Sequence, residues 1–160
     1  MTGRDVIRLT VACAVSFGAA LAGSVSMAGG DWSGWYDQLQ KPFFTPPPWL
    51  FGPVWTVLYL LMGVAAFLIW QKGLHVRAVR IALAWFLAQL VLNAAWTPVF
   101  FGARRLGLSV VVILLLWLAL AGTIRQFHRL SRVAALLLCP YLLWVSFAAV
   151  LNVSIWILNR

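Results

Sequence analysis

Charged residues are scarce in this sequence, and acidic residues are nearly absent. Only 9% of the 160 residues are charged, and the acids are Asp5, Asp31 and Asp37 alone. A soluble domain of this length needs a charged surface, because apolar atoms do not keep it in solution. Since 64% of the residues are hydrophobic, the composition excludes a soluble globular domain. It predicts a membrane protein with a single domain, 1–160.

The residue types of conventional catalysis and metal binding are also few. Cys13 and Cys139 show no metal-ligand spacing, and both fall in apolar runs, where packed thiols are expected. His75 and His128 fall in predicted loops. No Ser-His-Asp set, phosphate-binding loop or dinucleotide fingerprint occurs. We therefore predict no conventional catalytic residues and no metal site. Because intramembrane acids are missing, a proton-coupled pump is not predicted either.

The 12 cations lie in clusters that are separated by long uncharged runs. These runs cover 9–30, 42–71, 81–103, 106–124 and 133–159. About 20 apolar residues cross a bilayer as a helix, and in lipid the backbone groups must be hydrogen-bonded within the segment. We predict an all-α polytopic membrane protein with five transmembrane helices, at about 6–28, 50–71, 79–100, 106–126 and 133–158. A signal-peptide interpretation of the first run is disfavoured by its length.

The net charge of +9 is explained by membrane topology and does not predict a nucleic-acid partner. Eight cations lie in the N-terminal segment and in the second and fourth predicted loops, and four lie in the other loops and at the C-terminus. Cytoplasmic loops carry an excess of Lys and Arg. The distribution therefore predicts a cytoplasmic N-terminus.

The first loop, 29–49, is unusually long and rich in aromatic side chains. It holds six aromatic residues and ends in the run Pro46-Pro47-Pro48. Asp31 or Ser33 is a candidate cap for a short helix that ends before Pro42. Two interpretations stay open. The aromatics form an interfacial belt, or the loop is a structured lid that is stiffened by its prolines.

Aromatic and amide side chains share faces of three predicted helices. The faces, at helical spacing, consist of Trp55 and Tyr59; of Gln89, Asn93, Trp96 and Phe100; and of Tyr141, Trp144, Ala148 and Asn152. Polar side chains at membrane depth face the interior of a helix bundle. Converging faces of this kind would line a pocket for a planar apolar ligand. Amides that only hydrogen-bond between helices are the alternative interpretation.

Five segments, in order along nearly the whole chain, resemble one family. They are 35–36 (WY), 41–47 (KPFFTPP), 54–59 (VWTVLY), 92–102 (LNAAWTPVFFG) and 140–144 (PYLLW). These residues are similar to the TspO/MBR family, the tryptophan-rich sensory proteins related to the translocator protein or peripheral benzodiazepine receptor. The C-terminal sterol motif of animal members lacks its Tyr here, so sterol recognition is not predicted.

The resemblance implies a five-helix fold, often a homodimer, that binds protoporphyrin IX or haem as a ligand under the first loop. It implies no obligatory cofactor. The positions that match the family's pocket are Tyr36, Trp55, Tyr59, Asn93, Trp96, Trp144 and Ala148, with Gln89 as a further polar position.

The function implied by the resemblance is tetrapyrrole binding in transport, sensing or regulation, in a bacterial cell membrane. The alternative function is an enzyme that degrades protoporphyrin with light and oxygen. In that case Trp55 and Trp144 would be the reacting tryptophans.

Overall fold

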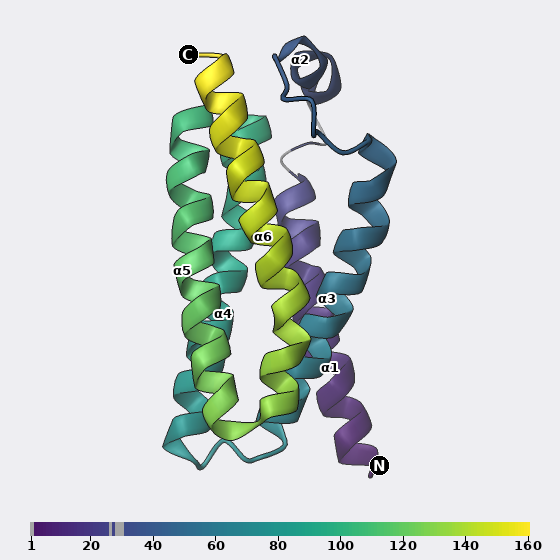
Figure 1. Ribbon diagram of the computed structural model, residues 1–160. Coiled ribbons are helices and arrows are strands. Elements are labelled where there is room, and N and C mark those ends of the chain that lie inside the picture. Colours follow the sequence, from purple (N-terminus) through teal and green to yellow (C-terminus); the bar gives the residue numbers. More distant parts are fainter. Residues whose placement is uncertain (1, 26, 28–30) are drawn as a thin grey trace.

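The computed structural model describes residues 2–25, 27 and 31–160, and these residues form helices and connecting segments without a strand. Figure 1 shows long helices side by side, with one short helix across one end of the bundle and the two chain termini at opposite ends. The elements are α1 (Gly3–Val25), α2 (Trp32–Gln38), α3 (Pro48–Trp70), α4 (Arg77–Thr97), η1 (Pro98–Gly102), α5 (Leu106–Leu130) and α6 (Arg132–Leu158).

Five helices are long and apolar enough to cross a membrane: α1, α3, α4 with η1, α5 and α6. The predicted all-α fold with five transmembrane helices is therefore confirmed. Helix α1 begins at Gly3 and α5 extends to Leu130, beyond the limits expected at 6 and 126. Charge gaps mark the hydrocarbon layer, whereas a helix continues into the polar interface, where Arg4 and Arg129 are tolerated. Residues 26 and 28 of the expected first span lie outside the described residues.

The ends of α2 and α3 follow from their sequences. The Asp31 side chain accepts a hydrogen bond of 2.9 Å from the backbone N–H of Gly34, so it caps α2. Helix α2 ends at Gln38, before Pro42. Pro47 is extended, with φ −63° and ψ 143°, and Pro48 occupies the first turn of α3, where no backbone N–H donor is needed.

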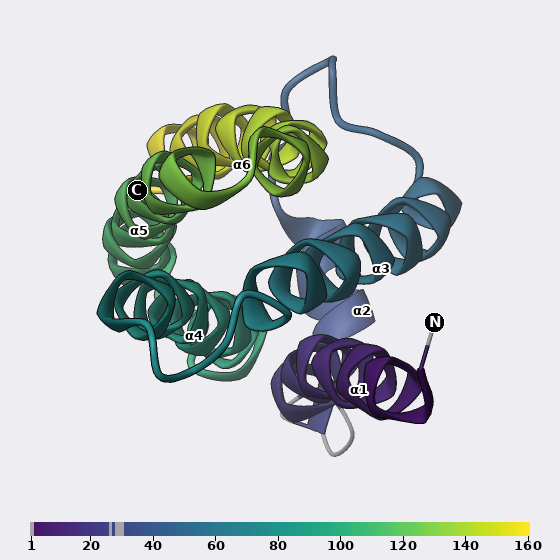
Figure 2. The same cartoon turned by 90° about the horizontal axis from the view of Figure 1, so that it is seen from below.

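The transmembrane helices α3, α4, α5 and α6 follow one another around the bundle, and α1 packs outside this ring against α3 and α4 (Figure 2). The small residues Ala12 and Ser16 of α1 are buried within this packing. Gly63 of α3 lies so close to α1 that an added Cβ would be 2.8 Å from the Cα of Cys13. Close approach through small residues is typical of helix packing in membranes.

We predict that Gly63→Ala separates α1 from α3 and destabilises the fold. The new methyl group would meet the backbone of Cys13, and a backbone cannot move aside by changing a side-chain rotamer. Overpacking of this kind costs about 1–3 kcal/mol. The measurement is the thermal unfolding midpoint of the detergent-solubilised protein. Gly18→Ala is the control, because nothing lies within 4 Å of a Cβ at Gly18. Equal midpoints for the two variants would contradict the packing described.

Candidate functional site

A cavity of about 510 Å³ lies under α2, inside the end of the bundle that holds the C-terminus. Its walls come from α1, the first loop, α3, α4 with η1, α5 and α6. Seven of the eight ligand-binding residues predicted from the sequence line it. These are Tyr36, Trp55, Tyr59, Asn93, Trp96, Trp144 and Ala148. The structure thus brings together residues from four separate segments, although their role in binding stays a prediction.

Gln89, the eighth predicted residue, does not line the cavity. It lies one helical turn from Asn93 and is fully buried. Its Nε2 atom lies 3.9 Å from the sulfur of Met62 on α3, and its Oε1 atom has no hydrogen-bond partner in the described part of the chain. The structure places Gln89 in the packed core, beyond the floor of the cavity.

Several lining residues carried no signal in the sequence. Ile113 and Leu116 of α5 and Ala20 of α1 form parts of the wall. The membrane-spanning parts of these helices show no pairing of aromatic and amide side chains at helical spacing, which was the signal on the other three helices. Phe101 also lines the cavity next to Phe100, whereas the helical spacing had indicated Phe100 alone.

The floor of the cavity is a hydrogen-bonded unit built on Asn93. The Tyr59 hydroxyl donates to Asn93 Oδ1 at 2.5 Å, and Asn93 Nδ2 donates to the Tyr141 hydroxyl at 2.7 Å. This unit ties α3, α4 and α6 together. Asn93 therefore makes the interhelical hydrogen bonds of the alternative interpretation, and it also lines the cavity. The two interpretations do not exclude each other.

A second amide connects the helices nearer to the lid. The Trp96 indole donates to Asn152 Oδ1 at 2.8 Å, and Asn152 Nδ2 donates to the Ser109 hydroxyl at 3.0 Å. These bonds join α4, α6 and α5. Because buried polar groups in hydrocarbon need partners, the two amides hold the cavity walls in register.

Tryptophans form much of the remaining wall. Trp55 stacks on Tyr59, with ring centroids 5.4 Å apart, and Trp55 makes an edge-to-face contact with Tyr141. Trp144 contacts Phe51 and Phe147 at centroid distances of 5.8 and 5.7 Å. Among the described residues no acceptor is found for the indole N–H of Trp55 or Trp144. The walls thus combine flat aromatic faces with two indole N–H groups that donate no hydrogen bond within the described residues.

Helix α2 covers the cavity by packing on the π-helical turn η1. Trp35 contacts Phe100 at 5.8 Å between ring centroids, and Trp32 and Tyr36 each contact Phe101 at 5.7 Å. The wider turn is closed by a hydrogen bond from Ala103 N–H to the Pro98 carbonyl. Such turns occur often at functional sites. The described part of the first loop is therefore structured, and its short helix α2 lies over the cavity.

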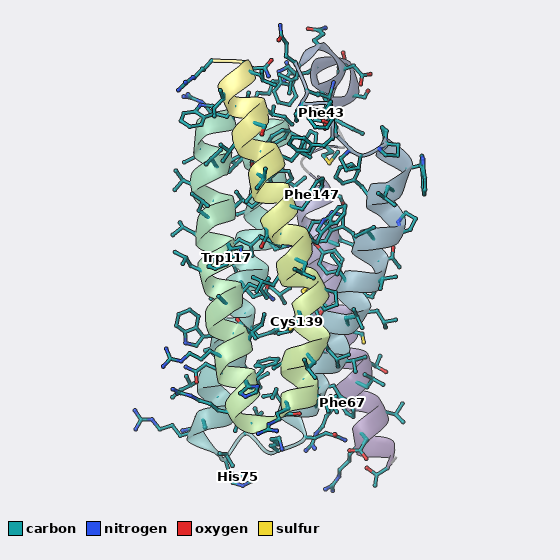
Figure 3. All side chains as sticks on the ribbon, in the orientation of Figure 1. Phe43, Phe67, His75, Trp117, Cys139 and Phe147 are labelled. Carbon is teal, nitrogen blue, oxygen red and sulfur yellow. The ribbon has the colours of Figure 1, made fainter. Side chains whose placement is uncertain are left out.

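The rest of the loop, 39–47, is held against α6. Asn159 makes two hydrogen bonds with the Gln40 backbone: its Oδ1 accepts from the N–H at 3.0 Å, and its Nδ2 donates to the carbonyl at 2.9 Å. Phe44 also contacts Phe147 of α6, which lies below the lid in Figure 3. Phe43 is fully exposed at this end of the molecule, consistent with an interfacial aromatic side chain.

Charged groups stand at the lid and not in the depth of the cavity. The Lys41 ammonium lies 4.6 Å from the Tyr36 ring centroid and donates to the Asp37 carbonyl. Partial burial, and then the Asp37 carboxylate, raise the pKa of Tyr36 above its ordinary value, so its phenol is neutral at pH 7. His75 lies at the opposite end of the bundle (Figure 3). The described residues hold no cluster of three potential metal ligands.

The sequence of this chain is similar to those of known proteins. The model of the TspO/MBR family matches residues 9–157. The chain belongs to the TspO/MBR family. The human translocator protein is 44% identical over 124 residues, which cover 76% of this chain and 73% of that protein. Protein CrtK of Rhodobacter capsulatus is 37% identical over 149 residues, which cover 93% of this chain and 89% of that protein. The tryptophan-rich protein TspO of Chlorobaculum tepidum is 43% identical over 127 residues, covering 79% and 80%.

We predict that Asn159→Ala loosens the lid. Losing both hydrogen bonds to Gln40, each worth about 1 kcal/mol, should speed amide exchange in 39–47 about tenfold or more. The measurement is hydrogen exchange followed by mass spectrometry. Ser154→Ala is the control, because the Ser154 hydroxyl bonds only its own helix, at Val150. Unchanged exchange in the Asn159 variant would show that these two hydrogen bonds do not hold the segment 39–47 in place.

Proposed function

We propose that this protein is an integral membrane tetrapyrrole-binding protein that acts in porphyrin transport, sensing or regulation. Protoporphyrin IX or haem is the ligand, held in the cavity under α2. The observation that carries the proposal is the lidded cavity of about 510 Å³ with aromatic walls and two amides. Ligand pockets occupy about 300–1,000 Å³ and are mainly apolar, with a few polar groups that orient the ligand.

The chemistry of the walls suits a large flat macrocycle. The rings of Trp55, Trp96 and Trp144 belong to three different helices that surround the cavity, and aromatic faces stack on a planar conjugated ligand. The unused indole donors of Trp55 and Trp144 are available to a polar edge. Lys41, which lies over Tyr36, places a cation at the lid, where a carboxylate side arm of the ligand would meet water.

We expect the macrocycle to be held by contacts with its faces and edges, which need no iron ligand. The residues that line the cavity include no His and no Cys. We therefore expect metal-free protoporphyrin IX to bind without help from a metal.

We also infer the placement in the membrane. The N-terminus and the loops 71–76 and 131 share one end of the bundle, which we assign to the cytoplasm by its excess of cations. Relatives from bacteria support a bacterial cell membrane. The homodimer stays a prediction from the family.

We predict that Ala148→Leu weakens protoporphyrin IX binding at least about fivefold. The larger side chain would enter the cavity, and overpacking of about 1–3 kcal/mol corresponds to a loss of about 5- to 150-fold in affinity. The measurement is quenching of tryptophan fluorescence in a titration in the dark. Ala88→Leu is the control, because Ala88 is exposed on α4 and does not line the cavity. Absence of quenching in the unmodified protein, or equal affinity of both variants, would overturn the proposal.

The same titration under illumination tests the photo-oxidative alternative. That function requires the Soret band of the bound porphyrin to bleach in light, and the bleaching to disappear in Trp55→Phe and in Trp144→Phe. Trp85→Phe is the matched control, because Trp85 packs against Gly122, and neither residue lines the cavity. A stable Soret band alongside fluorescence quenching means binding without degradation.

A further inference from the structure

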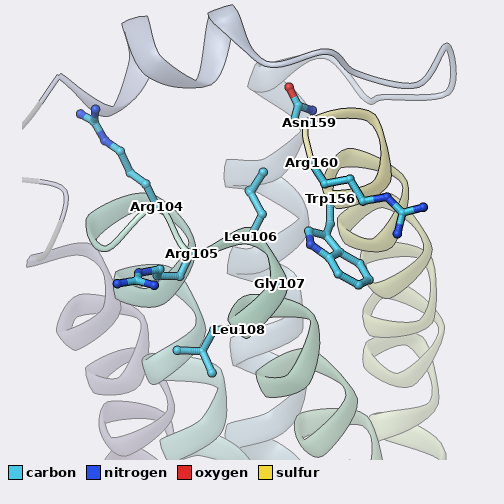
Figure 4. Close-up of a pocket in the computed structure, with 8 residues that line it drawn as sticks. All are labelled: Arg104, Arg105, Leu106, Gly107, Leu108, Trp156, Asn159 and Arg160. Atoms are coloured by element: carbon cyan, nitrogen blue, oxygen red, sulfur yellow. The ribbon is translucent and has the colours of Figure 1, made fainter.

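A second hollow, of about 580 Å³, lies outside the lidded cavity and shares no lining residue with it. It is an open groove between the beginning of α5 and the end of α6, at the lid end of the bundle. Figure 4 shows Arg105 on one side of the start of α5, and Trp156 and Arg160 on the other. The groove therefore lies where the spans end and where lipid headgroups begin.

Three arginines line this groove, and no carboxylate in the described part of the chain forms an ion pair with them. The Arg104 guanidinium is used by the lid: it lies 5.5 Å from the Trp35 ring centroid and donates to the Asp31 carbonyl. Arg105 and Arg160 are exposed. Guanidinium groups favour an anionic ligand, and they match phosphate oxygens in geometry.

The groove also has an apolar floor. The Trp156 indole lies against Gly107, where an added Cβ would be 3.1 Å from Nε1. Leu108, on the Arg105 side of the start of α5 in Figure 4, has 53% of its surface exposed, and an exposed row continues along α5 through Val111 and Leu115. An indole at a helix end is typical of the membrane interface. The apolar row is placed for contact with lipid chains.

We propose that this groove binds an anionic phospholipid, with the phosphate at the exposed arginines of the groove, Arg105 and Arg160, and an acyl chain along the exposed row of α5. Such a lipid matches both features of the groove. Its phosphate would meet the positive charge at the membrane interface, and its acyl chain would meet the apolar surface below it. A free phosphate ion would use only the first feature. A soluble acidic protein would not reach Val111 and Leu115, which lie on a transmembrane helix.

The test compares soluble short-chain ligands on the purified full chain in uncharged detergent. The probes are dioctanoyl-phosphatidylglycerol, dioctanoyl-phosphatidylcholine and inorganic phosphate, and the readout is the thermal unfolding midpoint at increasing probe concentration. We expect saturable stabilisation by phosphatidylglycerol that exceeds the effect of either other probe. Equal stabilisation by phosphatidylcholine, or by inorganic phosphate, would overturn the proposal, as would no stabilisation.

Two double variants test whether phosphatidylglycerol binds in the groove. Arg105→Gln combined with Arg160→Gln should weaken phosphatidylglycerol binding more than tenfold, because two charge-assisted hydrogen bonds are lost. Arg77→Gln combined with Arg132→Gln makes the same charge change at the opposite end of the bundle and should bind as the unmodified protein does. Equal weakening in both pairs would mean a general effect of net charge and would overturn the assignment.

The variant Gly107→Leu tests the shape of the groove without changing its charge. It fills the floor beside Trp156 and leaves every arginine in place, so we expect the stabilisation by phosphatidylglycerol to be lost. Protoporphyrin quenching in the same variant reports that the chain is folded. A folded Gly107 variant that still binds phosphatidylglycerol with unchanged affinity would place the lipid elsewhere.

Discussion

The hydrogen-bonded amide of Asn93 is the interaction on which the arrangement of the bundle depends. In hydrocarbon an amide has no water to bond, and leaving one buried group unsatisfied costs about 1–3 kcal/mol. Asn93 accepts from Tyr59 and donates to Tyr141, so three helices must keep one relative height and rotation. The cavity lies on the lid side of this unit, because there the same three helices turn Trp55, Trp96 and Trp144 toward a common space. The side chains that stabilise the bundle, Tyr59 and Asn93, therefore also line the candidate site.

The lid depends on an irregular stretch of backbone. The π-helical turn after Thr97 brings Phe100 and Phe101 under α2. The chain then leaves the turn through Arg104, which has a positive φ of 53°. This conformation is unfavourable for a residue with a side chain. Here the Arg104 side chain contacts the lid, so the exit from α4 and the position of α2 are linked.

The lidded cavity and the open groove lie at the same end of the molecule but differ in chemistry. The cavity is lined mainly by apolar and aromatic side chains, with Asp37 as its one acidic lining residue, whereas three arginines line the open groove. Two residues of the groove, Arg104 and Asn159, also hold the lid through Asp31 and Gln40. Any ligand in the groove would thus contact the groups that keep the cavity covered. The cavity and the groove are thus separate surfaces, and Arg104 and Asn159 connect the groove to the lid.

The sequence by itself determined the membrane class, the five helices and seven of the residues around the cavity. Long uncharged runs have one stable form in lipid, and aromatic and amide side chains at helical spacing indicate which faces of three helices turn inward. Only the tertiary structure decided that Gln89 lies in the core and that Ile113 and Leu116 of α5 line the cavity. It also decided that Asn159 holds the lid and that residues near 105 and 156 meet in a groove. A helix without aromatic and amide side chains at helical spacing carries no such signal for its rotation, and contacts between distant segments depend on that rotation.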